Sequence, residues 1–443
     1  MRTVAETLSP SDAAARLEAT DTLGIPLATG QPPAFLGALG HRTDWKDLKV
    51  YGALLGVGTE LFSHPNVHYL SGFFGPFERA LRDQGANISF AAADFRRFAP
   101  LLEEQKPRVM ATVAAPPDDD GWCSLSLHAG GTSTEMIRAA ADPDRLLVVE
   151  VSPNYPRTFG IAPDHMHALK VDEIDILVSS DASPLPLPDV EPSEPDQRIA
   201  EHATAYIPEG ATLQTGIGTI PSAIAARLAE GEKGDFGVHS EMFTNGLMAL
   251  HKAGKVTNAH KGCYDGVSVA TFAAGSEDLY EWLHENRDIA FLPVELVNST
   301  EAIARNRRMI TINGALAIDI HGQVVADTIA GSQFSGIGGH EDFIAGPALD
   351  VEDRSLLCFP ATYETKDGEL RSRIVPWFEA GAVITTPRHQ VDIVVTEHGA
   401  AELMGKTVNQ RAQALAEIAH PDFRDDLVAA GERATGGRAP HGD

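Results

Sequence analysis

Residues 213–228, LQTGIGTIPSAIAARL, decide the fold class of this 443-residue chain. The stretch begins as a short strand pattern over 213–218, passes through the turn GIGTIP, and continues at helical spacing over 221–231. Pro221 suits the first turn of a helix, where its missing N–H costs little. Backbone N–H groups that converge at such a turn favour a phosphate, although a tight structural turn also explains the string. The stretch predicts one strand–turn–helix unit of an α/β protein.

The same alternation of strands and helices extends along the chain. Residues 309–329 alternate in a way that suits a strand pair turning at His321 and Gly322. This pattern predicts parallel sheets covered by helices. The other predicted strands are 108–116, 145–152, 289–297, 381–387 and 391–399, and the other predicted helices are 134–142, 300–308 and 409–420.

Two features indicate two similar lobes. Residues 179–197 are rich in proline and acidic residues and have no apolar period, which is typical of a linker. Residues 27–39, LATGQPPAFLGAL, resemble 213–228 and also suggest a strand, a glycine turn and a helix start near Pro32. We therefore predict an N-terminal α/β domain over 1–182, a linker over 183–197 and a C-terminal α/β domain over 198–443. Ligands of such sheets bind in the crevice beyond the strand ends.

Composition excludes several classes of protein. The chain has 62 acidic residues against 35 Lys and Arg and a formal charge of -27, which argues against a nucleic-acid partner. Cys123, Cys263 and Cys358 are too few and too scattered for a disulfide framework or a zinc cluster. No apolar signal core or membrane-length apolar run occurs, so we expect no membrane association and a cytoplasmic location. No second ligand cluster accompanies residues 340–342 (HED), so no metal site is predicted.

One carboxylate stands out as a candidate nucleophile. Glu241 lies in GVHSEMFTNG (237–246), between small and apolar neighbours and about 20 residues after the glycine turn. A lone desolvated carboxylate close to a turn that can hold a phosphate-bearing ligand suits covalent acyl transfer. Glu241 also fits an ordinary polar position or a capping partner of Ser240 or Thr244, and His239 fits a structural histidine.

Three further strings carry candidate residues. The glycines of GIGG (336–339) allow close backbone approach and an oxyanion hole, or merely a flexible loop. Asn313 either points an amide at a substrate or closes a turn. Glu397, in VVTEHGAAELMGKT (394–407), is more typical of a structural acid near a helix start.

Taken together, the strings resemble a known family. The set of motifs resembles the acetyl-CoA hydrolase/transferase family, which includes 4-hydroxybutyrate, butyryl and succinyl CoA-transferases. The resemblance covers nearly the whole chain and is densest from about 199 to 430. The motifs that carry it are LQTGIGTIPSAI, GVHSEMFTNGLMAL, INGALAIDIHGQVVADTI, SGIGGHEDFIAGP, SRIVPWF, VVTEHGAAELMGKT and IAHPDFRDDL, with APPDDDGWCSLSL and VEVSPNYPRTFG in the first half.

This resemblance implies a fold and a set of site residues. It implies two open, mostly parallel α/β CoA-transferase domains with the active site between them, in a homodimer. The family's nucleophilic glutamate falls on Glu241, and its later glycine pair and its asparagine fall on Gly338, Gly339 and Asn313. Where relatives commonly have GGQ, this chain has His340 followed by Glu341, and Asn245 is a milder departure. The coenzyme A loop falls on Gly216, Ile217, Gly218, Thr219 and Ile220.

The predicted activity follows from the same resemblance. We expect transfer of coenzyme A between a short-chain acyl-CoA and a small free carboxylate, by a ping-pong cycle through a glutamyl-CoA thioester on Glu241. Coenzyme A and acyl-CoA then serve as substrates, with no tightly bound cofactor. The alternatives are an acyl-CoA hydrolase on the same scaffold, a non-catalytic CoA or phosphometabolite-binding protein, and a phosphosugar isomerase, which would need a lysine near the glycine turn.

Overall fold

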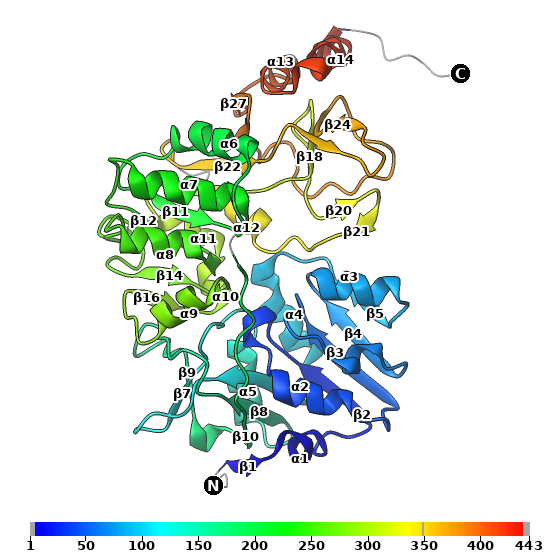
Figure 1. Cartoon of the computed structure of the whole chain (residues 1–443), viewed down its shortest axis with the longest axis vertical. Helices are drawn as coiled ribbons and strands as arrows, with labels where there is room; N and C mark the ends of the chain where they lie inside the picture. The colour runs from blue at the N-terminus through cyan, green and yellow to red at the C-terminus, as the bar shows by residue number, and fades with distance from the viewer. Residues whose placement is uncertain (1–4, 189, 348–349, 437–443) are drawn as a thin grey trace.

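The computed structural model describes residues 5–188, 190–347 and 350–436, which form two lobes (Figure 1). The N-terminal lobe, blue to cyan, is built on an eight-stranded sheet in the order β1-β10-β8-β6-β2-β3-β4-β5. Every neighbouring pair in this sheet is parallel. Its strands are β1 (Glu6–Leu8), β2 (Thr20–Gly24), β3 (Asp47–Gly52), β4 (Val67–Ser71), β5 (Ile88–Phe90), β6 (Val109–Ala114), β8 (Leu146–Val151) and β10 (Ile176–Ser179).

Burial explains which strands are central in this lobe. All six residues of β6 are buried, as expected for a strand covered on both faces. In β3, Leu48 and Val50 are buried while Lys49 between them is exposed, so this half of the sheet has one open face. The helices are α1 (Pro10–Ala14), α2 (Pro33–Gly40), α3 (Pro76–Asp83), α4 (Phe98–Gln105) and α5 (Ser133–Ala141), and a side pair is formed by β7 (Trp122–Ser124) and β9 (Ala168–Lys170).

The C-terminal lobe contains a six-stranded sheet in the order β12-β11-β17-β22-β26-β27. It is parallel except for its last pair, β26 and β27. Its strands are β11 (Thr212–Thr215), β12 (Gly237–Val238), β17 (Met309–Asn313), β22 (Arg354–Cys358), β26 (Ile393–Thr396) and β27 (Gly399–Glu402). Its helices are α6 (Glu194–Thr204), α7 (Thr219–Glu230), α8 (Asn245–Lys252), α9 (Glu277–Leu283), α10 (Val294–Val297), α11 (Thr300–Arg305), α12 (His340–Ala345), α13 (Val408–Glu417) and α14 (Arg424–Gly436).

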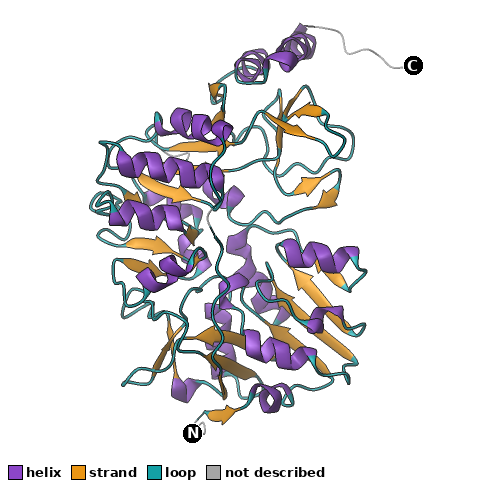
Figure 2. Cartoon of the chain, viewed as in Figure 1, coloured by secondary structure: helices purple, strands orange, loops and turns teal. Residues whose placement is uncertain are grey.

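Short strand groups extend this lobe, and Figure 2 shows them below the main sheet and to its right. Two parallel pairs continue towards the other lobe, and three small groups lie near α12 and beyond it. The pairs are β13 (Met242–Phe243) with β15 (Phe272–Ala273) and β14 (Ser268–Ala270) with β16 (Ile289–Phe291). The groups are β18 (Ala317–Asp319), β19 (Val324–Val325) and β25 (Ile374–Val375), then β20 (Thr328–Ile329) with β21 (Ser332–Gln333), and β23 (Thr362–Glu364) with β24 (Leu370–Ser372).

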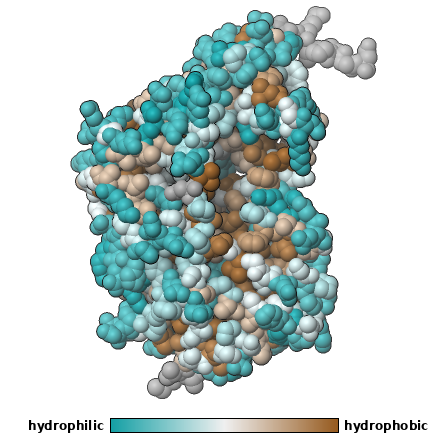
Figure 3. Space-filling view, viewed as in Figure 1, coloured by the Kyte–Doolittle hydropathy of each residue, from teal (hydrophilic) through white to brown (hydrophobic). Residues whose placement is uncertain are grey.

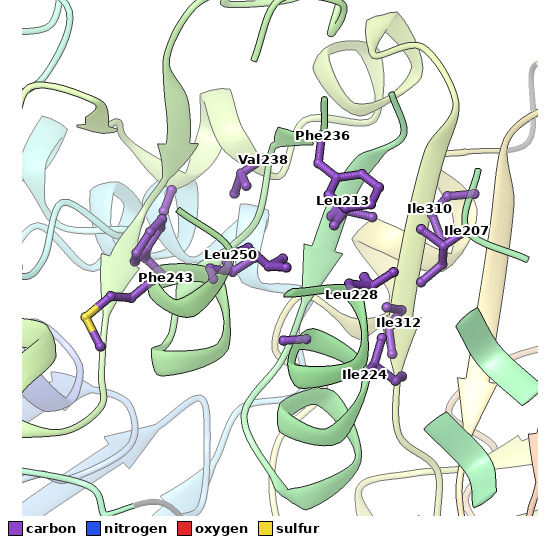
Figure 4. Close-up of a cluster of buried hydrophobic side chains, with 14 of the residues drawn as sticks. Ile207, Leu213, Ile224, Leu228, Phe236, Val238, Phe243, Leu250, Ile310 and Ile312 are labelled. Carbon is purple, nitrogen blue, oxygen red and sulfur yellow. The ribbon is translucent and has the colours of Figure 1, made fainter. Parts of the chain in front are cut away.

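The predicted fold class, two mostly parallel α/β units, is confirmed by this architecture. The core of the C-terminal lobe shows why the quoted stretch forms it. Leu213 of β11 packs with Ile224 and Leu228 of α7, and with Ile310 and Ile312 of the neighbouring strand β17 (Figure 4). Alternate strand residues and one helix face thus bury the same apolar cluster, which favours the strand–turn–helix order.

The two lobes meet along a seam, where backbone hydrogen bonds connect one lobe to the other. The N–H of Phe95 donates to the carbonyl of Gly338 at 2.9 Å, and the N–H of Val294 donates to the carbonyl of Gly130 at 2.9 Å. Phe272 packs with Phe95 at this seam. Figure 3 shows apolar residues gathered along the middle of one face of the molecule. Among the described residues, none of the helices combines the length and apolar character needed to cross a membrane.

Four sequence-based details differ from the structure. Residues 381–387 form no strand, because Val383 and Ile384 lie exposed in a loop. Residues 289–297 divide into β16 and the short helix α10. The first copy of the repeat is not a strand at 27–29, because β2 ends at Gly24 and a 3-10 turn spans Ala28–Gly30. Helix α6 begins within the predicted linker, where Ser193 caps the N–H of Asp196.

Candidate active site

Glu241 lies at the seam, in the connection between β12 and β13. Its carboxyl oxygen Oε2 accepts a hydrogen bond of 2.7 Å from the side-chain amide of Asn298. The backbone N–H of Gly339 also donates to this carboxyl group. The residue is only partly exposed, so protein groups surround most of the side chain.

Burial dominates the electrostatics of this carboxyl group. Burial is the main cause that raises the pKa of Glu241 to about 8. The hydrogen bonds from Asn298 and Gly339 lower this pKa, and the nearby charge of Asp342 raises it, within that net value. A carboxylate that water solvates poorly is more reactive towards an electrophile than one in bulk solution. Once Glu241 has lost its proton, its carboxylate is therefore an unusually reactive nucleophile.

The raised pKa predicts a pH dependence of stability. Between about pH 4.5 and 8 the folded protein keeps the proton of Glu241 while the unfolded chain releases it, so this group lowers the free energy of unfolding as pH rises. Glu241→Gln removes that loss. We expect the variant to gain stability relative to the natural chain from pH 5 to pH 8, as measured by urea unfolding at both pH values. An equal difference at the two pH values would contradict the shifted pKa.

The glycine loop, residues 336–339, faces this carboxyl group. Gly338 has φ of +56°, a left-handed conformation that glycine adopts readily. A Cβ atom at Gly339 would lie 1.9 Å from Oε2 of Glu241 and 2.6 Å from the amide nitrogen of Asn298. Position 339 therefore has room only for glycine, and the structure brings Glu241, Gly338 and Gly339 together.

The predicted coenzyme A loop borders a separate cavity nearby. Gly216, Ile217, Gly218 and Thr219 line a cavity of about 410 Å³, but Ile220 packs against the apolar core instead. The linker closes another side of the cavity through Leu187, Pro188 and Val190, and Thr244 and Asn245, shortly after Glu241, also line it.

A hydrogen bond connects the glycine turn to the HSEM string. The hydroxyl of Ser240 donates to the carbonyl of Thr215 at 3.1 Å. Ser240 precedes Glu241, and Thr215 precedes Gly216, so the two motifs lie side by side as the sequence suggested. Asn313 ends β17 and its amide exchanges long contacts of 3.4 and 3.5 Å with Gln214 of β11. The structure gives Asn313 no described contact with Glu241.

The two unusual residues of the GGHEDF string, His340 and Glu341, both contact Thr386. His340 Nε2 lies 2.9 Å from the hydroxyl of Thr386, which also donates to the carboxyl of Glu341. Burial lowers the pKa of His340 to about 4 and raises that of Glu341 to about 7. Both side chains therefore tie α12 to the loop at Thr386, which itself forms a β-bridge with Val324.

Two other candidates have structural surroundings. His239 is fully buried with Nε2 2.8 Å from the carbonyl of Val297, and burial lowers its pKa to about 3. Glu397 accepts a hydrogen bond of 2.8 Å from the N–H of Ala361.

Sequence reasoning missed three residues around Glu241. Asn298 donates not only to Glu241 but also to Asp342 Oδ2 at 3.0 Å. Arg96 of the N-terminal lobe pairs with Asp342 Oδ1 at 3.2 Å. Asn298 directly follows the predicted strand 289–297 and belongs to none of the quoted motifs, and Arg96 also lies in no motif. Only Asp342, within GGHEDF, had a local signal.

Comparisons with known proteins place this two-lobed protein in a class of enzymes that act on coenzyme A thioesters. Residues 275–431 match the family model described as the acetyl-CoA hydrolase/transferase C-terminal domain. The chain is 34% identical to a succinyl-CoA:cyclohexane-1-carboxylate CoA transferase of Geobacter metallireducens, over 96% of this chain and 94% of the relative. It is 37% identical to a 4-hydroxybutyrate coenzyme A transferase of Clostridium kluyveri, over 74% of this chain and 73% of the relative.

A solved structure agrees along nearly the whole chain. RipA from Yersinia pestis superimposes with a TM-score of 0.86 at 29% identity and covers 97% of each chain. The chain therefore belongs to the acetyl-CoA hydrolase/transferase family, as its motifs predicted. It is an enzyme of the acyl-CoA:carboxylate transferase or hydrolase type.

Proposed function

We propose that this enzyme transfers coenzyme A between a short-chain acyl-CoA and a free carboxylate, with Glu241 as the covalent carrier. The observation that carries the proposal is a largely desolvated carboxyl group held against two glycines at the seam between lobes. A non-catalytic binding protein has no need of a carboxyl group whose ionisation burial disfavours. The transferases among its relatives supply the reaction class.

The first half of the cycle loads coenzyme A onto the enzyme. An oxygen of the Glu241 carboxylate attacks the thioester carbonyl, the C–S bond breaks, and a mixed anhydride and CoA thiolate form. The thiolate then attacks the glutamyl carbonyl and expels the first carboxylate. The second half repeats these steps in reverse with a second carboxylate, so no thioester energy is lost and no ATP is consumed.

The glycine loop supplies the electrostatic assistance. The N–H groups of Gly338 and Gly339 are our candidates for donors to the tetrahedral oxyanions. Removing one oxyanion donor typically costs about 3 kcal/mol of the barrier. Exclusion of water decides between transfer and hydrolysis, because water competes for both the anhydride and the glutamyl thioester. The competing function is therefore an acyl-CoA hydrolase on the same residues.

A panel of acceptors tests this assignment. Acetate, propionate, butyrate, succinate and 4-hydroxybutyrate would each be incubated with acetyl-CoA and enzyme, and new acyl-CoA would be measured by chromatography. We expect parallel-line ping-pong kinetics with at least one acceptor. Consumption of acetyl-CoA at a rate independent of every acceptor would instead assign a hydrolase.

Gly216→Ala tests the coenzyme A site separately from the chemistry. A Cβ atom at Gly216 meets nothing within 4 Å, so the free enzyme should keep its melting temperature. If the phosphates of coenzyme A approach this backbone, the methyl group clashes with them. We expect KM for acyl-CoA to rise about tenfold or more, the loss of roughly one good contact, with little change in kcat. An unchanged KM would place coenzyme A elsewhere.

Two further expectations concern assembly and domain boundaries. Homodimer formation stays a prediction, which sedimentation equilibrium or light scattering would test. The domain boundaries 1–182 and 198–443 also stay predictions, which limited proteolysis within the linker would test.

A further inference from the structure

Helix α3 of the N-terminal lobe binds the backbone of a hairpin in the opposite lobe. The side chain of Arg79 donates to the carbonyl of Phe334 at 2.7 Å, and that of Arg82 donates to the carbonyl of Gln333 at 2.5 Å. The Arg79 guanidinium also lies over the Phe334 ring, 4.4 Å from its centre. Figure 1 shows α3 directly below β20 and β21, the two strands of this hairpin. The two arginines are three residues apart on one helix, so they reach the hairpin from the same face of α3.

The hairpin leads directly into the glycine loop beside Glu241. Strand β21 ends at Gln333, and the loop begins three residues later at Gly336. The Gln333 amide donates to the carbonyl of Ser335 at 2.8 Å and to the carboxyl group of Asp327 at 3.0 Å, so this short connection has its own internal hydrogen bonds. A shift of Gln333 would therefore also move the glycines that contact the nucleophile.

The same helix fixes a loop of its own lobe that borders the nucleophile. Glu78 of α3 is fully buried, and its carboxyl group accepts hydrogen bonds from the N–H groups of Leu55 at 2.6 Å and Gly75 at 2.9 Å. Phe73 lies two residues before Gly75. A Cβ atom at Gly338 would lie 3.4 Å from the Phe73 ring and 3.8 Å from a carboxyl oxygen of the nucleophile. Helix α3 thus holds the Phe73 loop and, through its arginines, the approach to the glycine loop.

Each arginine has partners on both lobes. Within its own lobe, Arg79 donates to the carbonyl of Phe74 at 3.3 Å, and Arg82 pairs with Asp83 at 2.9 Å. A guanidinium group has five N–H donors in a rigid plane, so one side chain can bind two groups at once. The two arginines therefore join the lobes directly.

Resting on the function proposed above, we propose that Arg79 and Arg82 form a clamp that keeps water away from coenzyme A loaded on Glu241. The clamp consists of these two side chains and the carbonyls of Gln333 and Phe334. In Figure 1 the hairpin lies to the right, whereas α7, which follows the predicted coenzyme A loop, lies to the left. The clamp is therefore separate from that loop. Its arginines contact none of the reacting atoms, so they are positioning residues.

The competing reaction defines what the clamp prevents. Water that reaches the glutamyl thioester adds its oxygen to the glutamyl carbonyl carbon, the C–S bond breaks, and the departing thiolate takes up a proton of the water. The products are free coenzyme A and the regenerated carboxyl group of Glu241, so one thioester is lost in each event. A closed clamp favours transfer, and an open clamp favours hydrolysis.

Replacing both arginines with methionine tests the clamp, because methionine is a flexible side chain without an N–H donor. The enzyme would receive acetyl-CoA and the fastest acceptor of the panel above. A thiol reagent would measure free coenzyme A, and chromatography would measure the new acyl-CoA. We expect Arg79→Met/Arg82→Met to raise the ratio of hydrolysis to transfer about fivefold or more, the effect of losing one or two partly exposed charged contacts.

The loaded enzyme provides a second measurement. Enzyme incubated with acyl-CoA and freed of the excess by gel filtration should release coenzyme A into water faster in the double variant than in the natural chain. Neither the ratio nor this decay rate depends on the fraction of enzyme that is folded. A purely structural role would lower both products in proportion and leave the ratio unchanged. The single variants Arg79→Met and Arg82→Met supply the same two measurements if the double variant is insoluble.

Two controls separate the clamp from general loss of charge. Arg79→Lys/Arg82→Lys should recover part of the natural ratio, because an ammonium group still donates to a carbonyl but lacks the planar guanidinium. Arg138→Met removes an arginine of α5 that pairs with Glu103 at 2.7 Å inside the same lobe, and it should leave the ratio unchanged.

The outcomes distinguish this proposal from the proposed function. Full turnover by Glu241→Gln, or hydrolysis by the natural enzyme at a rate independent of every acceptor, would overturn the proposed function and the clamp with it. If the natural enzyme transfers coenzyme A through Glu241 while the methionine variants keep its ratio of hydrolysis to transfer and its decay rate, only the clamp is overturned.

Discussion

Replacing Glu241 with glutamine should reduce CoA transfer by about 10⁴-fold or more, because the amide cannot attack a thioester and a reaction with no nucleophile retains only binding and oxyanion contributions. Gln is nearly the same size as Glu and can still accept the hydrogen bond from Asn298, so the fold should remain intact. Initial rates of acyl-CoA exchange with each acceptor measure the effect.

Glu364→Gln is the matched control. Glu364 lies exposed in β23, away from the seam contacts, and its substitution should leave turnover within about twofold, as for most surface changes. Turnover by Glu241→Gln within tenfold of the natural enzyme would remove Glu241 from the mechanism.

Replacing Gly339 with alanine should have the next largest effect. The new Cβ atom would lie 1.9 Å from Oε2 of Glu241, so either the carboxyl group or the loop must move. The backbone at Gly339 has φ of -87°, which alanine adopts without strain, so the clash itself is the main damage. A displaced nucleophile and a displaced oxyanion donor together should cost about 10³-fold in kcat.

Gly37→Ala provides the comparison for this change. Gly37 lies within α2, and a Cβ atom there meets nothing within 4 Å. Alanine in a helix interior should raise stability by about 0.5–1 kcal/mol and leave kcat unchanged. Melting curves and rates for both variants test the pair. A Gly339→Ala enzyme with full kcat would show that the loop does not need to contact Glu241.

Much of the fold could be predicted because its signals are local. The buried run of β6 and the glycine turn before α7 each carry their own pattern, and both elements lie where the patterns place them. The predicted strand at 381–387 was wrong. Its β-branched residues favour a strand, but among the described residues no strand pairs with this segment beyond the single bridge of Thr386. Helix α10 was missed because its four residues are too few to show a helical period.

The site could be predicted only in part, because only some of its residues lie in a recognisable local sequence pattern. Glu241 and the glycine loop have strings around them that mark a family. Asn298, Asp342 and Arg96 become neighbours only through the packing of the two lobes. An asparagine before Ser-Thr and an arginine in a short 3-10 turn (Phe95–Arg97) carry no local pattern that distinguishes them from surface residues.

The central claim is that Glu241 becomes covalently loaded with coenzyme A, and trapping that state tests it most directly. The enzyme would be incubated with acyl-CoA in the absence of acceptor, treated with borohydride to reduce any enzyme-bound thioester, digested, and mapped by mass spectrometry. We predict a reduced glutamyl side chain at position 241 together with loss of activity, and neither in Glu241→Gln. Loss of activity with Glu241 unmodified, or modification at another carboxyl group, would contradict the account.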